Sequence, residues 1–243
     1  MPDSKPVHPC THGTGFISSL FLLSVQSLNS ILAEHQSLLL IDASSQTVHL
    51  GWLQQGQTPR WSAIEQEAGT GLYALLEEGV LSPNVAGAFA YCEGPGSILG
   101  IRTVAAALRT WTALTSRPVY SYRSLDFLVH TEGRPGATFI SDARRRSWHA
   151  ITIDAEGSPE PLQRIPEGEL PSGELLMPQG FRTWTELPTP TPKSVPYQPA
   201  RITEDFADTD IFSVSPDPDA FQPEPPSYAR WSPQVHQAPP PKP

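Results

Sequence analysis

The sequence predicts an α/β protein in which helices flank a mixed sheet, and three features of its first half support this. Two apolar runs, Leu38–Ile41 and Val85–Tyr91, have the length and composition of buried strands. A long amphipathic stretch follows the second run at residues 98–114. Between them lies a turn that contains glycine and proline, residues 93–97. A strand, a tight turn and a helix in this order are typical of α/β proteins.

The first predicted element is a β-hairpin. Its first strand ends in the Asp-x-Ser turn Asp42–Ser44, and apolar residues then alternate along a second strand, residues 46–53. In such a turn the aspartate side chain accepts hydrogen bonds from the backbone N–H groups of the turn itself. We therefore interpret Asp42 first as a structural residue.

Two helices and a strand are expected next. Apolar residues recur at helical spacing over residues 61–78, and Gly79 ends the pattern, so a helix is predicted there. The strand Val85–Tyr91 and the glycine turn lead to the helix over 98–114, with Ser97 as its N-cap. A helix that begins behind a glycine turn can receive an anion, but a β–α corner without a ligand explains the same residues.

The second half is predicted to contain shorter elements. They are a strand over 119–122, a helix over 125–130 capped by Ser124, a hairpin over 137–142 and 148–154, and a strand over 175–177.

Three motifs in this chain resemble those of the TsaB family, the YeaZ-like subunit of the bacterial machinery that makes threonylcarbamoyladenosine in tRNA. Residues 41–44 match the family's I-D-T-S motif except for alanine in place of threonine. Residues 94–102 match G-P-G-S-F-T-G-[LIV]-R, with Ile98 and Leu99 in place of Phe and Thr. Residues 142–150 resemble D-A-R-R-x-x-[VI]-Y-x-A. The resemblance extends over residues 38–154.

The resemblance implies an actin-like (ribonuclease H-like) lobe followed by a reduced second lobe. It also implies a cytoplasmic, non-catalytic scaffold or activating subunit, which pairs with a TsaD-like catalytic subunit and is joined by a TsaE-like ATPase. ATP and metal are then expected on these partners, tRNA is reached only through the complex, and no membrane contact is expected. A homodimer through the same helices is an alternative arrangement.

The site residues that we single out fall into two groups. The family-motif residues are Asp42, Ser44, Gly94, Pro95, Gly96, Ser97, Gly100, Arg102, Asp142 and Arg144. The expected partner interface uses small and apolar residues of the two long helices, since small side chains let helices approach closely. These residues are Ala68, Gly69, Gly71, Tyr73, Ala74, Ala105 and Leu108. Arg102 is expected to pair with Glu93 or Asp42, or to face solvent.

Two other classes of function remain open. One is an ATP-binding, protease-like or carbohydrate-kinase-like enzyme of the same superfamily, whose nucleotide-binding members place phosphate and metal at the position of Asp42. The other is a diverged pseudo-subunit that only binds protein. The enzyme is disfavoured because the second lobe lacks a glycine-rich phosphate turn. It is also disfavoured because the predicted helix around residues 66–76, where the catalytic paralogue carries a closely spaced histidine pair, contains no histidine. Ser97 does not lie in a G-x-S-x-G motif.

Four regions are expected along the chain. Residues 1–36 are predicted to be an unstructured or miscalled leader, residues 37–133 the first lobe and residues 134–187 the second. Residues 188–243 are rich in proline and acidic residues, a composition typical of disordered tails. Tyr228–Arg230 resembles a terminal family motif, which would require the tail to return to the fold.

Charge and cysteine content narrow the partners further. The net charge of −9 argues against nucleic-acid binding by the chain alone, and Arg144–Arg146 is interpreted as a solvated turn. The two cysteines, Cys10 and Cys92, form no metal-binding or disulfide pattern, which fits a reducing compartment.

Overall fold

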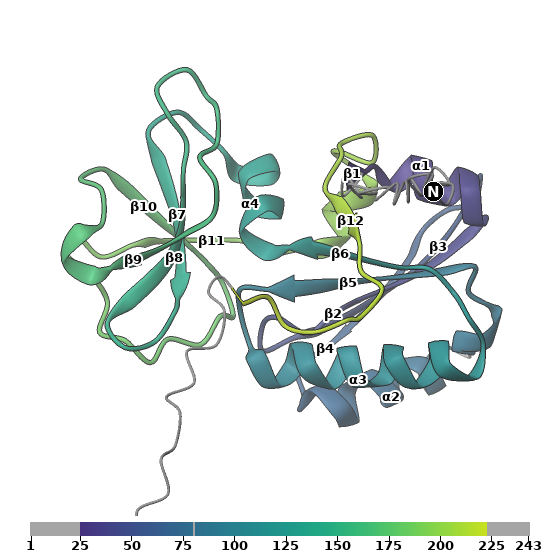
Figure 1. Ribbon diagram of the computed structural model, residues 1–243. Helices are drawn as coiled ribbons and strands as arrows, with labels where there is room; N and C mark the ends of the chain where they lie inside the picture. The colour runs from purple at the N-terminus through teal and green to yellow at the C-terminus, as the bar shows by residue number, and fades with distance from the viewer. Residues whose placement is uncertain (1–24, 80, 223–243) are drawn as a thin grey trace, which may run out of the picture.

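The computed structural model describes residues 25–79 and 81–222. They form two lobes, each built on a sheet, with helices packed on the sheet of the first lobe (Figure 1). The first sheet has the order β1-β12-β6-β5-β2-β3-β4, and the second has the order β11-β10-β7-β8-β9. Both sheets mix parallel and antiparallel pairs. The predicted α/β class with a mixed sheet is therefore confirmed.

The first sheet is built around three parallel strands, β2, β5 and β6, with antiparallel strands on both sides. Its buried central strands carry the apolar runs that predicted them, because both of their faces are covered by helices. The bounds are β1 (Val25–Gln26), β2 (Ser37–Asp42), β3 (Val48–Gln54), β4 (Arg60–Ile64), β5 (Ala88–Gly94), β6 (Val119–Arg123) and β12 (Phe212–Val214).

Helices cover the two faces of this sheet. The helices α2 (Ala68–Glu78) and α3 (Ile98–Leu114) lie side by side on one face, and α1 (Leu28–His35) and α4 (Ser124–Glu132) lie on the other (Figure 1). The helix predicted over 98–114 is thus confirmed, and its N-cap Ser97 accepts a hydrogen bond from the N–H of Gly100 at 3.3 Å. No described helix is long and apolar enough to cross a membrane.

The second lobe follows α4 and contains the predicted hairpin. It comprises β7 (Ala137–Asp142), β8 (Ser147–Thr152), β9 (Gln163–Pro166), β10 (Glu174–Pro178) and β11 (Lys193–Val195). One face of its sheet joins the hydrophobic core that also contains α1 and α4. The two lobes therefore share one continuous core on that side of the molecule.

The prediction of a helix over 61–78 is wrong in its first part. Residues 60–64 form the edge strand β4, and α2 begins only at Ala68 with Glu67 as its N-cap. The Trp61 ring covers Gly51 on β3, where a Cβ atom would lie only 2.7 Å from the ring. This packing onto a neighbouring strand outweighs the helical spacing of the apolar residues.

The prediction that residues 1–36 are unstructured is wrong for residues 25–36. Ser27 caps α1. Leu28 and Ile31 of that helix are buried in the same hydrophobic core as side chains of β2 and β6. β1 pairs with β12 from the other end of the chain. Residues 25–36 are therefore part of the first lobe.

The predicted disordered tail is wrong for residues 188–222. Beyond β11 the chain returns to the first lobe, where β12 inserts between β1 and β6. Buried side chains anchor it although proline is frequent: Val195, Tyr197, Ile202, Phe206 and Phe212. Tyr228–Arg230 lies outside the described residues.

The burial of α1 leads to a first prediction. Ile31→Ala should lower the free energy of unfolding by about 2–5 kcal/mol, because it leaves a cavity in a fully buried position. Urea unfolding followed by circular dichroism measures this loss. Glu34→Ala on the exposed side of the same helix is the control and should change the value by less than about 0.5 kcal/mol. Equal effects of the two substitutions would show that α1 does not belong to the core.

Candidate functional site

The Asp42 turn forms as predicted at the end of β2. The Asp42 Oδ1 atom accepts hydrogen bonds from the backbone N–H of Ser44 at 2.8 Å and from its hydroxyl at 2.6 Å. These bonds close the Asp-x-Ser turn and satisfy one carboxylate oxygen.

The second oxygen of Asp42 is held by two tyrosines, which the sequence did not indicate. Tyr122 on β6 and Tyr197 after β11 donate their hydroxyls to Oδ2 at 2.5 and 2.6 Å. Burial, and then the charge of Asp42, raise the pKa of both phenols well above the usual value. Both tyrosines therefore stay protonated and act as donors to a carboxylate with no exposed surface.

This arrangement does not fit a nucleotide-bound metal at Asp42. Each carboxylate oxygen already accepts two hydrogen bonds, so a cation would have to displace both tyrosine hydroxyls from a buried site. The described residues contain no group of three or more side chains that could ligate a metal ion. The carboxylate instead ties β2, β6 and the C-terminal segment together.

The Gly-Pro-Gly-Ser turn packs directly on the Asp42 turn. A Cβ atom on Gly96 would lie 2.4 Å from the carbonyl oxygen of Ser44, and one on Gly100 would lie 2.2 Å from that of Ala43. The N–H of Ser97 donates to the same Ser44 oxygen at 2.7 Å. The glycines are thus required by close contact between two backbone segments, which favours the structural interpretation of this motif.

Two further residues of this motif, Gly94 and Pro95, also have structural roles. Gly94 has φ of +113°, a backbone conformation that few other residues adopt. The carbonyl of Pro95 accepts a hydrogen bond from the Ser124 hydroxyl at 2.5 Å, which links the turn to α4. Their positions again point to support of the fold. The prediction that Ser124 caps α4 is wrong: Ser124 is the first residue of the helix, and Arg123 is its N-cap.

Arg102 pairs with neither Glu93 nor Asp42. Its guanidinium lies 3.6 Å from Asp219 at the surface, and Glu93 is instead paired with Arg123 at 3.1 Å. The sequence could not indicate this because Asp219 belongs to the returning C-terminal segment. Exposed pairs of this kind contribute little to stability.

Asp142 organises the third motif in the second lobe. Its carboxylate accepts hydrogen bonds from the backbone N–H groups of Arg144, Trp184 and Thr185, and from the Thr185 hydroxyl at 2.9 Å. Partial burial raises the pKa of Asp142, but the backbone hydrogen bonds outweigh burial and hold it below the usual value. The arginine turn is thus fixed to the segment that carries Trp184.

A cavity of about 250 Å³ lies between the two lobes and brings two of the predicted motifs together. The first lobe contributes the start of α3 with Ser97, and the second contributes Asp142, Arg144 and His149. Arg182 and Trp184 complete the wall and were not identified from the sequence. The sequence pointed to these two residues only weakly, through the presence of an arginine and a tryptophan in a segment with few apolar residues.

His149 is a largely buried histidine in the wall of this cavity. Its buried Nδ1 atom has no hydrogen-bond partner among the described residues. Burial, and then the charge of Arg164, lower its pKa from 6.5 to about 4, while Asp142 opposes the shift. His149 is therefore neutral at physiological pH.

The expected partner interface is partly wrong. Gly71, Ala105 and Leu108 are buried within this chain's own core, so they are not available to a partner. A Cβ on Gly69 would contact Thr103 of α3 at 3.7 Å, so this small residue serves the packing of α2 on α3. Ala68 and Ala74 are half-buried, and Tyr73 is exposed to 54%. A Cβ on Gly71 would lie 3.1 Å from Ile64 and 3.2 Å from Val48, so this residue serves the packing of α2 on the sheet.

The chain is similar in structure to YeaZ from Pseudomonas aeruginosa. The TM-score is 0.45 at 16% sequence identity, covering 59% of this chain and 75% of YeaZ. A second structure, described as an uncharacterized protein with similarity to peptidase YEAZ from Pseudomonas aeruginosa, gives 0.44 at 16% identity over 65% and 86% of the two chains.

A more distant similarity is to the Ppx/GppA phosphatase of Aquifex aeolicus. Its TM-score is 0.29 at 10% identity, covering 60% of this chain and 68% of the phosphatase. At the level of sequence, the chain matches no family model and no curated protein.

The buried carboxylate gives a second prediction. Tyr197→Phe removes one donor to Asp42 and should lower the free energy of unfolding by about 2 kcal/mol, since a hydrogen bond to a buried charge is lost. Urea unfolding measures the change. Tyr73→Phe, on an exposed tyrosine, is the matched control and should be neutral. A neutral Tyr197→Phe variant would show that Asp42 does not need this hydroxyl.

The pKa of His149 gives a third prediction. Between about pH 6.5 and about 4 the unfolded chain binds a proton at this position that the folded chain does not, so its stability falls as the pH falls through this window. His149→Gln removes this effect. From pH 7 to pH 4 the unfolding free energy of the wild type should therefore fall by up to about 3 kcal/mol relative to that of the variant. Urea unfolding at several pH values measures it. A difference that does not change with pH would contradict the lowered pKa.

Proposed function

We propose that this chain is the non-catalytic scaffold subunit of the complex that adds the threonylcarbamoyl group to adenosine in tRNA. The observation that carries the proposal is the state of Asp42. Its four hydrogen bonds seal the position at which nucleotide-binding members of this superfamily place phosphate and metal. The Gly-Pro-Gly-Ser motif, which resembles that of the TsaB family, packs directly on this sealed site, which supports a structural role for it.

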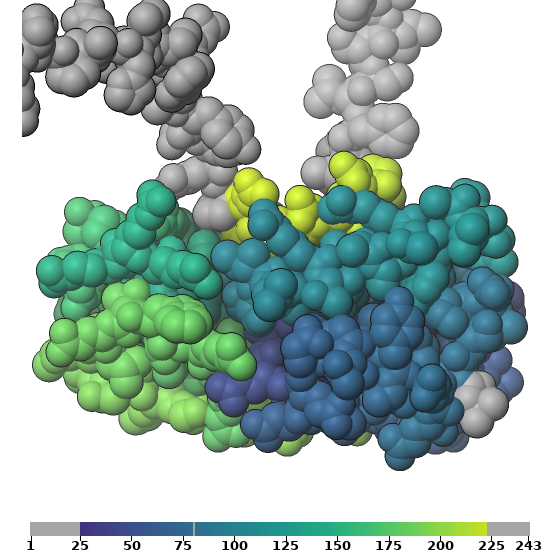
Figure 2. All heavy atoms as spheres, turned by 90° about the horizontal axis from the view of Figure 1, so that it is seen from below, coloured from purple at the N-terminus to yellow at the C-terminus, as the bar shows by residue number. Residues whose placement is uncertain are grey.

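The proposed partner is a TsaD-like catalytic subunit, which carries the metal and the ATP-dependent chemistry together with a TsaE-like ATPase. The outer surface of α2 and α3 is the proposed contact (Figure 2, in blue and teal). It presents side chains that the chain itself leaves exposed: Thr70, Tyr73, Leu99, Ala106 and Thr110. An exposed tyrosine and leucine among small residues are suited to a helix–helix contact between chains. This exposed set replaces the buried residues that the sequence suggested.

Reconstitution tests the proposal. Supplied with tRNA, ATP and threonylcarbamoyl-adenylate as the donor, the purified chain alone should transfer no threonylcarbamoyl group to tRNA. Adding the chain to the TsaD-like and TsaE-like proteins of the same organism under these conditions should restore the transfer, with AMP as the leaving group. Transfer by the chain alone would contradict the scaffold role. Binding to the TsaD-like protein without any gain in activity would instead indicate the diverged protein-binding pseudo-subunit.

The contact surface gives a fourth prediction. Ala106→Arg should weaken binding to the TsaD-like protein by more than about a hundredfold, because it places an unpaired charge in a helix–helix contact. The matched control is Ala33→Arg, an exposed position on α1 at the opposite face of the sheet. Titration calorimetry measures affinity, and the melting temperature shows whether each variant folds. Equal affinity of the two folded variants would place the interface elsewhere.

A further inference from the structure

We propose that Arg144, Arg145, Arg182 and Trp184 form a contact surface for RNA, in which the arginines bind phosphates and the indole stacks on an unpaired base. The inference rests on the proposed function in one respect, since that function makes tRNA the natural RNA. It assigns a direct contact to a chain that was otherwise expected to reach tRNA only through its partners.

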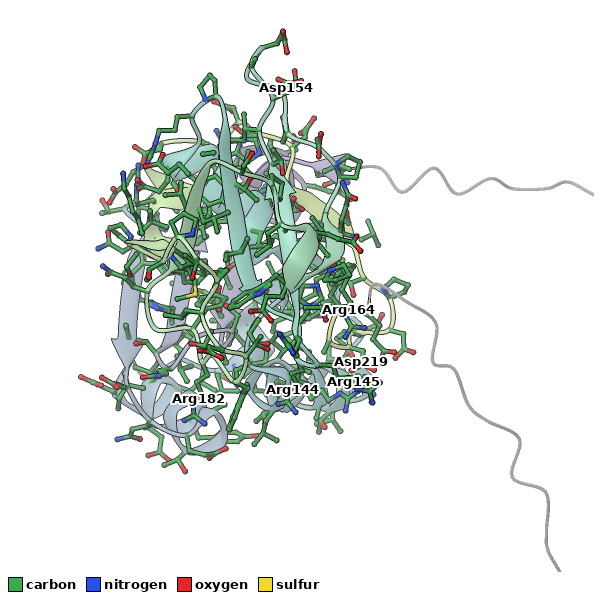
Figure 3. All side chains as sticks on the ribbon, turned by 90° about the vertical axis from the view of Figure 1, so that its left-hand side faces the viewer. Arg144, Arg145, Asp154, Arg164, Arg182 and Asp219 are labelled. Atoms are coloured by element: carbon green, nitrogen blue, oxygen red, sulfur yellow. The ribbon has the colours of Figure 1, made fainter. Side chains whose placement is uncertain are left out.

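The charges of this surface are available for a ligand. Arg146 pairs with Glu167 at 3.1 Å, but within the described residues no salt bridge involves Arg144, Arg145 or Arg182. All three side chains are exposed, and they lie along one end of the molecule (Figure 3). Unpaired guanidinium groups are well suited to bind phosphate oxygens in pairs of hydrogen bonds.

Trp184 adds a stacking surface between these charges. Its side chain is exposed to 69%, which is unusual for so large an apolar group. The Arg144 guanidinium lies 5.6 Å from the centre of its ring. Asp142 binds the backbone N–H groups of both residues, so their relative position is fixed before any ligand arrives. An aromatic ring bordered by arginines is a common platform for unpaired bases.

The backbone of the arginine turn supports a role for its side chains. Arg144, Arg145 and Arg146 have φ values of 60°, 53° and 55°, in the left-handed region. This conformation is unfavourable for residues other than glycine and, to a lesser degree, asparagine. Three consecutive arginines in it are better explained by a use for their charges than by the needs of a hairpin turn.

The surface also borders two hollows of suitable size. Arg144 and Trp184 line both the 250 Å³ cavity between the lobes and a more open hollow of about 550 Å³ beside the arginine turn. Arg182 also lines the interlobe cavity. A nucleotide strand could therefore place a phosphate at the arginines and a base against the indole.

The net charge of −9 does not exclude this contact. At an ionic strength of about 0.1 M, charges are screened beyond about 10 Å, so the local charges determine binding at this surface. In the open hollow these are Arg144, Arg145 and Arg146 against Glu167 and Glu186, and Glu167 is already paired with Arg146. An acidic protein segment is the competing ligand, but it would make no specific use of an exposed indole face.

The fifth prediction concerns RNA binding by the full-length chain. A fluorescein-labelled tRNA transcript is titrated with the protein at about 0.1 M salt, and anisotropy reports binding. Arg145→Glu and Arg182→Glu should each weaken binding at least tenfold. Each should also reduce the slope of log affinity against log salt concentration by the equivalent of about one phosphate contact. Arg60→Glu is the matched control, because it makes the same change of charge at an exposed position of β4 and should alter affinity less than twofold.

Stacking is tested separately from charge. Trp184→Ala should weaken binding about tenfold and leave the salt dependence unchanged, because it removes a stacked base and no phosphate contact. Equal weakening by Arg60→Glu and Arg145→Glu, or no binding by the wild type, would overturn the inference. Displacement of the labelled tRNA by a poly-glutamate peptide at lower concentrations than by unlabelled tRNA would identify an acidic protein ligand and also overturn it.

The two proposals can fail independently. If Arg145→Glu still binds the TsaD-like protein and tRNA binding is unaffected, the scaffold role stands and the RNA contact falls. If the chain binds tRNA as predicted but neither binds nor stimulates the TsaD-like protein, the RNA contact stands and the proposed function falls.

Discussion

The buried carboxylate of Asp42 is the constraint on which much of this structure depends. A charge without exposed surface is strongly unfavourable unless its oxygens are fully hydrogen-bonded. Here the donors come from three places: the Ser44 turn, Tyr122 on β6, and Tyr197 beyond β11. Satisfying one side chain therefore requires the end of β2, a parallel strand two positions away and the C-terminal segment to meet at one point.

The return of the C-terminal segment has consequences across the first lobe. After Tyr197, the chain places Phe206 and Phe212 in the core and adds β12 to the sheet edge. β12 in turn pairs with β1, so the segments before β2 and after β11 support each other. The same segment supplies Asp219, which pairs with Arg102 and Arg109 on α3. The two ends of the described chain thus complete a lobe whose central elements lie between them.

Two aspartates at strand ends have opposite roles in the two lobes. Asp42 is enclosed, and its neighbours leave no access for a ligand. Asp142 also binds backbone N–H groups, but it holds an exposed tryptophan and an arginine turn at the mouth of a cavity. The exposed surface that these two turns present therefore lies at the rim of the second lobe and not at the turn of the first. This difference is what joins a structural role at Asp42 to a binding role near Arg144.

The sequence by itself determined the α/β class, the β2–β3 hairpin, the Asp42 turn and α3 with its Ser97 cap. These depend on local periodicity, turn residues and capping, which act over a few neighbouring positions. Only the tertiary structure decided that residues 60–64 form a strand, that the tyrosines seal Asp42 and that Arg102 pairs with Asp219. It also decided which small helix residues are buried and that a proline-rich segment is ordered. Each of these depends on contacts between residues far apart in the chain, whose energies outweigh local preference and leave no local pattern.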